Sequence, residues 1–441
     1  MWIYGGGFST GNSDDPAYNG QFFAEQEDVV LVSFNYRLNV FGFPGTPNST
    51  QNLGLLDQRL AVEWVQNNIE AFGGDPSRIT LFGQSAGSAS VDYYTYAWAD
   101  DPIAHSFIEE SGSVFGPAPG LGAASAEVAA NYWFNLTNAL QCGDSSSDPA
   151  STLSCMKGKE YTVILDTLAK QTANGASPIA SSFGPTVDNT VVFSDYKQRS
   201  TSGKVSKLPL LLGNADYEAG LFRVLDALKN VSLPSSYWDA FDNAVFVCPC
   251  ATRANVSLSN NVPTWRYRWF GAFPNTELTT IPFSGAWHAS ELPVLFGNVP
   301  TGSGVPNSTA AETQIGAYIR GAWAAFAKDP VAGLKSYGGG WPEYDPSGQT
   351  LVRLAFNNMT GTNLALGSFY DGACSTIVAV SGSGSGNGSG SATGTGSGSG
   401  TGSTGTNSAP SSTASTGGAM AMAVSVTGML GVVIAMGFAV L

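Results

Sequence analysis

Charge is scarce in this chain. Only 12% of the residues are charged, with 19 Lys and Arg against 33 Asp and Glu, and the formal net charge is -14. Nucleic-acid binding requires clustered Lys and Arg, so the composition excludes it as the main function. A disordered acidic chain is excluded as well, because 43% of the residues are hydrophobic and 11% are aromatic.

Charge is absent altogether from residues 381–441, which also hold 16 of the 54 glycines. The composition therefore predicts three parts, namely a globular body at 1–378, a disordered Ser/Gly/Thr-rich spacer at 379–418 and a hydrophobic segment at 419–441. The last segment is long enough to cross a bilayer. Because no Lys or Arg follows Arg353, the pattern favours a cleaved GPI-anchor signal, with Asn407 as the candidate attachment site, over a transmembrane tail anchor.

Seven N-x-S/T sequons predict glycosylation on a secretory route, and they begin at Asn48, Asn135, Asn230, Asn255, Asn307, Asn358 and Asn387. A secretory route requires a signal peptide, yet the opening residues MWIYGGGFST contain no basic region followed by an apolar one. We therefore expect Met1 to be an internal methionine of a longer protein. The expected location is extracellular or at the cell surface.

Cysteine is also scarce, with five residues. Cys142 and Cys155 flank a polar loop and are predicted to form a disulfide in an oxidising compartment. Cys374 lies near the end of the body and can pair with Cys248 or Cys250, which leaves one thiol. A zinc site is the weaker interpretation, because neither histidine lies at ligand spacing from a cysteine pair. No metal or other cofactor is expected.

Strand and helix patterns alternate along the body. Apolar, β-branched runs predict strands at 29–37, 78–83, 107–112, 208–213 and 264–270, and periodic patterns predict helices at 52–72 and 312–330. A Gly/Ser-rich segment that follows the second strand can begin another helix. This order predicts an α/β fold with a doubly wound, mostly parallel sheet that has helices on both faces.

Two features refine this expectation. The helix at 52–72 is expected to use Leu56, Leu60, Val62, Trp64 and Ile69 as its apolar positions. Residues 120–205 and 222–262 have less regular patterns and are expected to lie outside the sheet, as cap or pocket-forming segments.

A GQSAG sequence follows the strand at 78–83 and places Ser85 between Gly83 and Gly87. A serine in G-x-S-x-G between a strand and a helix is typical of a nucleophile on a tight turn, where only small flanking residues fit. Such a serine needs a base, and the chain has only two histidines, His105 and His288. Hydrolases with this motif run nucleophile, acid, base along the chain, so elimination favours His288 and leaves His105 as a structural or surface residue.

Asp216 and Glu218 follow the strand at 208–213, at the carboxyl edge of the expected sheet. A carboxylate there can hold the tautomer of the base and stabilise its protonated form, and position alone does not separate the two residues. Backbone N–H groups for an oxyanion can come from the glycines at 5–7 and from Ala86. A phosphate-binding loop is the competing interpretation of these glycines, but the G-x-x-x-x-G-K pattern is missing.

Together, five ordered blocks resemble the type-B carboxylesterase/lipase family, α/β-hydrolases that include cholinesterases and fungal lipases. They are WIYGGGFSTG, VVLVSFNYRLNVFGFPG, NLGLLDQRLAVEWVQNNIEAFGGDPSRITLFGQSAG, GNADYEAG and GAWHASELP, and they span nearly all of residues 1–370. The last two are similar to those of fungal secreted esterases. Members of this family normally carry a longer segment before the GGG loop, with the first strands of the sheet and an early disulfide. We therefore expect the hydrolase domain to be N-terminally incomplete here.

The resemblance implies an α/β-hydrolase fold and a role for each matching residue. Ser85 is the implied nucleophile, Glu218 the acid and His288 the base. Further implied positions are the oxyanion donors Gly6, Gly7 and Ala86, a serine near the acid at Ser111, and a structural ion pair between Arg37 and Asp75.

The sequence thus predicts a serine carboxylic-ester hydrolase that forms an acyl-enzyme at Ser85 on a small-molecule or lipid ester. Membrane contact is expected only through the C-terminal anchor signal. Two alternatives are a catalytically silent, cholinesterase-like cell-surface binding protein and an inactive fragment of an incomplete gene model.

Overall fold

The computed structural model describes residues 1–117, 121–172 and 183–374. The candidate site Asn407, the sequon at Asn387, the spacer and the hydrophobic segment 419–441 lie outside these residues. Within the described residues, no helix combines the length and the apolar content needed to cross a membrane. The six sequon asparagines that are described, Asn48, Asn135, Asn230, Asn255, Asn307 and Asn358, are all exposed.

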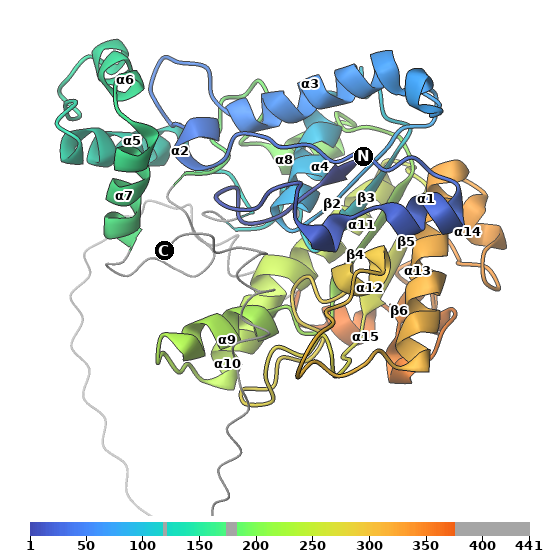
Figure 1. Ribbon diagram of the computed structural model, residues 1–441. Coiled ribbons are helices and arrows are strands. Elements are labelled where there is room, and N and C mark those ends of the chain that lie inside the picture. Colours follow the sequence, from blue (N-terminus) through green and yellow to red (C-terminus); the bar gives the residue numbers. More distant parts are fainter. Residues whose placement is uncertain (118–120, 173–182, 375–441) are drawn as a thin grey trace, which may run out of the picture.

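A seven-stranded sheet runs through the centre of the described body (Figure 1). Its strands lie side by side in chain order, and they are β1 (Trp2–Ile3), β2 (Thr80–Gln84), β3 (Ser106–Glu110), β4 (Leu210–Ala215), β5 (Thr264–Trp269), β6 (Leu351–Leu354) and β7 (Asn363–Ala365). The first six are parallel and β7 is antiparallel to β6. Strands β1 to β5 are buried along their whole length, as the near-continuous apolar runs of a covered parallel sheet predict.

Helices cover both faces of the sheet, and two consecutive residues of β3 show this. Glu109 lies 3.5 Å from Arg253, a residue of α11 (Cys248–Ser259) that also pairs with Asp92 of α4 (Ala86–Ala97). Its neighbour Glu110 accepts a hydrogen bond from Trp323 of α13 (Ala310–Lys328). Since consecutive strand residues point to opposite faces, α4 and α11 lie on one side and α13 on the other. The α/β fold with a doubly wound, mostly parallel sheet is therefore confirmed.

The segment at 29–37 is not a strand, contrary to expectation. It forms a single bridge, between Ser33 and Trp2, and Trp2 N–H donates to Val32 O at 2.8 Å. Its neighbour β1 is only two residues long, because the chain turns away into the glycine loop directly after it. One bridge cannot make a ladder, so an apolar run that is typical of a strand stays outside the sheet.

The predicted helix at 52–72 forms as α3 (Leu53–Asn68) and a short 3-10 turn, η2 (Ile69–Phe72), which ends at Gly73 with φ +82°. Its buried face differs from the expected one, since Leu60 and Trp64 are exposed. The buried positions of α3 are instead Gly54, Leu55, Gln58, Arg59, Val62 and Val65. They follow the three-to-four residue spacing of one helix face, and the two exposed positions lie on the opposite face.

Residues 120–205 contribute no strand to the sheet among the described positions, and most of the described positions there are helical rather than irregular, apart from 183–195. They form α5 (Ala126–Ala139), α6 (Pro149–Lys157), α7 (Tyr161–Thr172) and α8 (Tyr196–Thr201). Helices α5, α6 and α7 lie beside the main body (Figure 1) and share a small apolar core that includes Trp133 and Met156. The predicted disulfide between Cys142 and Cys155 joins the segments around α5 and α6, with a Cα–Cα distance of 5.5 Å.

Residues 222–262 are also helical, in α9 (Ala219–Leu228), α10 (Ser235–Asp242), the π-helical turn η3 (Asn243–Val247) and α11. Cys248, at the start of α11, forms a disulfide with Cys374 at a Cα–Cα distance of 5.2 Å. Cys250 is therefore the free thiol, and it is buried. This pairing resolves the alternative that the sequence left open.

The ion pair between Arg37 and Asp75 is not present. Arg37 forms a bidentate pair with Asp57, with both contacts at 2.8 Å, and its backbone N–H donates to the same carboxylate. Asp75 instead accepts from Ser77 and from the Arg78 guanidinium at 2.7 Å. Asp75 thus pairs with an arginine three residues away, while Arg37 pairs with Asp57 of α3, and these two pairs stand in place of the expected one.

Candidate active site

Ser85 occupies a tight turn between β2 and α4, with φ +59° and ψ −122°. A residue other than glycine rarely adopts these backbone angles, so the surrounding backbone must enforce them. A Cβ on Gly87 would lie 1.9 Å from the carbonyl oxygen of Ile3, and one on Gly83 would lie 2.6 Å from the backbone of Gly87. The two motif glycines are therefore required by close backbone contact. The turn is fixed further by a 2.8 Å hydrogen bond from Ser85 N–H to Glu110 O.

His288 and Glu218 form a buried pair. His288 Nδ1 lies 2.5 Å from Glu218 Oε2, and the two side chains are 6% and 0% exposed. The second carboxylate oxygen, Oε1, accepts the backbone N–H of Ala215 at 2.7 Å. Asp216, the alternative acid, faces away and pairs with Arg268 at 2.8 Å. The geometry thus assigns Glu218, and not Asp216, as the partner of His288.

The imidazole of His288 lies beside the end of β2. The side-chain amide nitrogen of Gln84, the residue before Ser85, lies 3.2 Å from Nε2 and 3.4 Å from Nδ1. Within the described residues, the polar partners of the ring are Gln84 and Glu218, and no hydrogen bond joins it to Ser85. The other histidine, His105, directly precedes β3. It is exposed, whereas His288 is buried.

The glycine loop after β1 packs directly on Ser85. A Cβ on Gly5 would lie 2.8 Å from Ser85 Cβ. Gly6 has φ +109°, and a Cβ added to it would lie 2.3 Å from Thr10 O. Gly7 also has positive φ, at +60°. Ala86 is the first residue of α4, where backbone N–H groups have no intrahelical acceptor. Gly5, which directly precedes the expected donors Gly6 and Gly7, thus lies against Ser85, and the expected donor Ala86 directly follows the serine in the chain.

Ser111 follows β3 with φ +57° and is buried. Its Oγ has no hydrogen-bond partner among the described residues, and both oxygens of Glu218 are engaged by Ala215 and His288 instead. The structure thus shows no direct bond from this serine to the acid.

Aromatic rings and buried acids surround the pair, and sequence patterns did not single them out. The centroids of Phe222 and Phe246 lie 5.4 Å and 4.6 Å from that of His288. Phe246 belongs to the π-helical turn η3, an irregularity that has no sequence signature of its own. Asp242, which ends α10, accepts the Ala219 N–H at 2.5 Å, and burial and the nearby Glu218 raise its pKa to about 8.

Two further carboxyls, those of Glu110 and Glu291, are buried in the same part of the molecule. Burial raises the pKa of Glu110 to about 8, although the hydrogen bond from Trp323 partly opposes this. Burial also raises the pKa of Glu291 well above its usual range, and Glu110 and Glu218 add to that effect by repulsion. Burial therefore favours the neutral forms of these acids.

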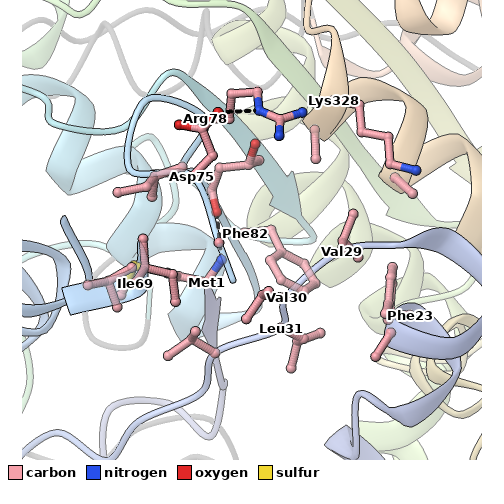
Figure 2. Close-up of a pocket in the computed structure, with 18 of the residues that line it drawn as sticks. Met1, Phe23, Val29, Val30, Leu31, Ile69, Asp75, Arg78, Phe82 and Lys328 are labelled. Carbon is pink, nitrogen blue, oxygen red and sulfur yellow. Dashed lines mark hydrogen bonds and ion pairs between the residues drawn. The ribbon is translucent and has the colours of Figure 1, made fainter. Parts of the chain in front are cut away.

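The described residues contain no group of three or more His, Cys, Asp or Glu side chains that could hold a metal ion. A cavity of about 360 Å³ lies elsewhere, at the amino ends of β1 and β2 (Figure 2). It is lined by apolar side chains such as Phe23, Leu31 and Phe82, with Asp75, Arg78 and Lys328 at its edge. None of the candidate site residues lines this cavity, because Ser85 lies at the carboxyl end of β2.

Known proteins share much of this sequence. Residues 1–239 match the sequence profile of the carboxylesterase family. The chain is 36% identical to the chlorogenic acid esterase of Aspergillus niger over 336 residues, which cover 76% of this chain and 62% of the relative. It is 33% identical to secreted lipase 5 of Gibberella zeae over 378 residues, covering 81% and 68% of the two chains. A mouse cholinesterase is 32% identical, covering 80% and 65%. The chain thus spans about two thirds of the length of these relatives.

The buried Glu110 makes a testable contribution to the pH dependence of stability. Its pKa is raised from 4.5 to about 8, so the folded protein binds this proton more tightly than the unfolded chain. Stability is therefore lost as the pH rises through this range. Glu110→Gln keeps an acceptor for Trp323 but cannot titrate. Between pH 5 and pH 8, we expect the unsubstituted protein to lose on the order of 3 kcal/mol more of its free energy of unfolding than this variant loses.

Urea unfolding at both pH values measures this difference. Glu343→Gln is the control, because Glu343 is half exposed and pairs with Lys335 at 3.1 Å. It should leave the pH dependence unchanged. Equal pH profiles for Glu110→Gln and the unsubstituted protein would contradict the assignment.

Proposed function

The chain belongs to the carboxylesterase family, and from that membership we propose that the protein is a serine carboxylic-ester hydrolase that forms an acyl-enzyme at Ser85. The observation that carries the proposal is the buried 2.5 Å contact of His288 with Glu218, next to a serine held at φ +59°. The relatives are named for a chlorogenic acid ester, for lipids and for choline esters. Because these names differ, the proposal is made at the level of carboxylic esters, as esterase or lipase.

In the proposed reaction, Ser85 Oγ attacks the ester carbonyl carbon and gives its proton to His288 Nε2. Glu218 holds the proton on Nδ1, so that Nε2 is the free base, and stabilises the imidazolium that forms. The tetrahedral intermediate collapses when the C–O bond to the alcohol breaks and His288 returns the proton to the leaving oxygen. Water then repeats the sequence on the acyl-enzyme and releases the acid. The contact between Ser85 and Nε2 needs to tighten only when substrate binds.

The carbonyl oxygen becomes an oxyanion in this step, and Gly6, Gly7 and Ala86 are the proposed donors. Gly6 and Gly7 have no side chain that could keep a substrate oxygen away from their backbone N–H groups. A larger residue would not fit in place of Gly6, because its Cβ would lie 2.3 Å from Thr10 O. Loss of one such donor typically costs about 3–4 kcal/mol in transition-state stabilisation. Ser111 is the proposed supporting residue near the acid by resemblance to the family, although its buried hydroxyl makes no hydrogen bond to Glu218 among the described residues.

We also propose the organisation and location of the whole chain. Residues 1–378 are the hydrolase domain, residues 379–418 a spacer and residues 419–441 a GPI-anchor signal with Asn407 as its site. The exposure of the six described sequons supports a glycosylated, extracellular or cell-surface protein. One of the relatives has a name that suits this location, secreted lipase 5.

Turnover of short-chain p-nitrophenyl esters tests the nucleophile and the base. The assay uses the protein as its gene encodes it, with any residues before Met1 retained. We expect Ser85→Ala and His288→Ala each to lower kcat by roughly 10⁴-fold or more, because either change removes the attacking group or its base. His105→Ala is the matched control, since His105 is the only other histidine and is exposed. Equal turnover by Ser85→Ala and the unsubstituted protein would contradict the proposal.

A second pair of variants tests the acid. Glu218→Gln should reduce kcat by roughly 10²- to 10⁴-fold, because the amide cannot stabilise the imidazolium. Asp216→Asn removes only the pairing with Arg268 at the edge of the site and should retain most of the activity. Steady-state kinetics on the same esters distinguishes them, and the reverse ranking would assign the acid to Asp216.

A further inference from the structure

Gln84 has a place in the site that the reaction described above does not use. It is the last residue of β2 and is buried, at 3% exposure. Its amide nitrogen reaches across to the loop that carries His288 and lies 3.2 Å from Nε2 and 3.4 Å from Nδ1. A side chain at this point can influence both the orientation and the charge of the base.

The two near-equal distances define how the amide meets the ring. The lone pairs of the two imidazole nitrogens lie in the ring plane and point to different sides. A donor on the Nε2 lone pair would therefore be much farther from Nδ1 than from Nε2. Near-equal distances place the amide over the face of the ring instead. Gln84 thus leaves the in-plane lone pair of Nε2 free for Ser85, while Nδ1 stays on Glu218 at 2.5 Å.

The other contacts of the ring are apolar. Phe222 of α9 and Phe246 of η3 pack against it, with centroid distances of 5.4 Å and 4.6 Å. Neither ring can form a directed hydrogen bond that fixes the rotation of the imidazole. Over the ring face, the Gln84 amide adds a polar contact to this packing, and together with Glu218 on Nδ1 it restricts the rotation of the imidazole.

The charged and titratable groups around the base are mostly acidic. Glu218 contacts the ring, and the groups that interact electrostatically with Glu218 or with its neighbours are Asp242, Asp216, Arg268, Glu291 and Glu110. A carboxylate at position 84 would add one more negative charge next to the ring. The amide keeps the same shape without that charge.

Resting on the proposed function, we propose that Gln84 is a positioning residue for His288. Its amide holds the imidazole plane so that Nδ1 stays on Glu218 and Nε2 faces Ser85. Because the amide is uncharged, it adds no negative charge beside the ring, as a carboxylate in the same place would.

The chain offers a direct test, because it contains only two histidines and therefore two imidazole Cε1–H resonances in an NMR spectrum. Gln84→Glu should raise the titration midpoint of His288 by about one pH unit or more. It should move the acidic limb of the kcat/KM profile upward by the same amount. The exposed His105 is the internal control and should titrate identically in every variant.

Gln84→Met tests the positioning by itself, since it fills the space but has no polar group to hold the ring. We expect kcat to fall roughly tenfold or more with KM nearly unchanged, and the His288 midpoint to move less than in Gln84→Glu. Gln84→Asn, whose amide is too short to reach the ring, should behave like Gln84→Met. These two variants carry the test if Gln84→Glu does not fold, as judged by near-ultraviolet circular dichroism.

An unchanged His288 midpoint in folded Gln84→Glu, or unchanged kcat in both Gln84→Met and Gln84→Asn, would overturn the inference. The NMR titration needs no turnover, so it separates this inference from the proposed function. If the unsubstituted protein hydrolysed no ester and the midpoint still shifted, the proposed function would fail and the contact between Gln84 and His288 would stand.

Discussion

The candidate site depends on the close packing of backbone around Ser85. A Cβ on Gly87 would lie 1.9 Å from Ile3 O, and one on Gly112 would lie 2.1 Å from Ser85 O. The residues after β1, β2 and β3 therefore touch one another directly at the carboxyl edge of the sheet. This contact keeps Ser85 at φ +59° and also brings the glycine loop to the serine. One constraint thus fixes both the candidate nucleophile and the glycine loop that carries proposed donors for the oxyanion of the tetrahedral intermediate.

The electrostatics of the site depend on how many hydrogen-bond donors each buried carboxyl group has. Glu218 is fully buried, yet it accepts from Ala215 N–H and contacts His288. Asp242 and Glu110 are buried with fewer donors, and burial raises the pKa of each to about 8. Burial thus favours the neutral forms of Asp242 and Glu110, while Glu218 is the carboxyl that contacts His288. Gln84 fits the same pattern, as a neutral group against the base.

The sequence predicted those parts of the structure that local pattern determines. Strands β2 to β5 have apolar runs and α13 has a clear period, and the G-x-S-x-G motif locates Ser85 without further information. Pairing partners were not predictable in this way. The run at 29–37 forms no strand because β1 is too short to pair with it, and Arg37 pairs with Asp57 rather than Asp75. Phe246 and Gln84 meet His288 only through the tertiary fold, so no local pattern could identify them.

The central claim is that Ser85 is a nucleophile poised by His288. Covalent labelling with a fluorophosphonate, followed by mass spectrometry of the peptide that contains Ser85, tests it most directly. Such a probe reacts with an activated serine and not with an ordinary one, and it depends on no particular substrate. The account predicts a single adduct on Ser85 that is lost in His288→Ala and retained in His105→Ala. Absence of label on Ser85 in the folded protein, or equal labelling in His288→Ala, would contradict it.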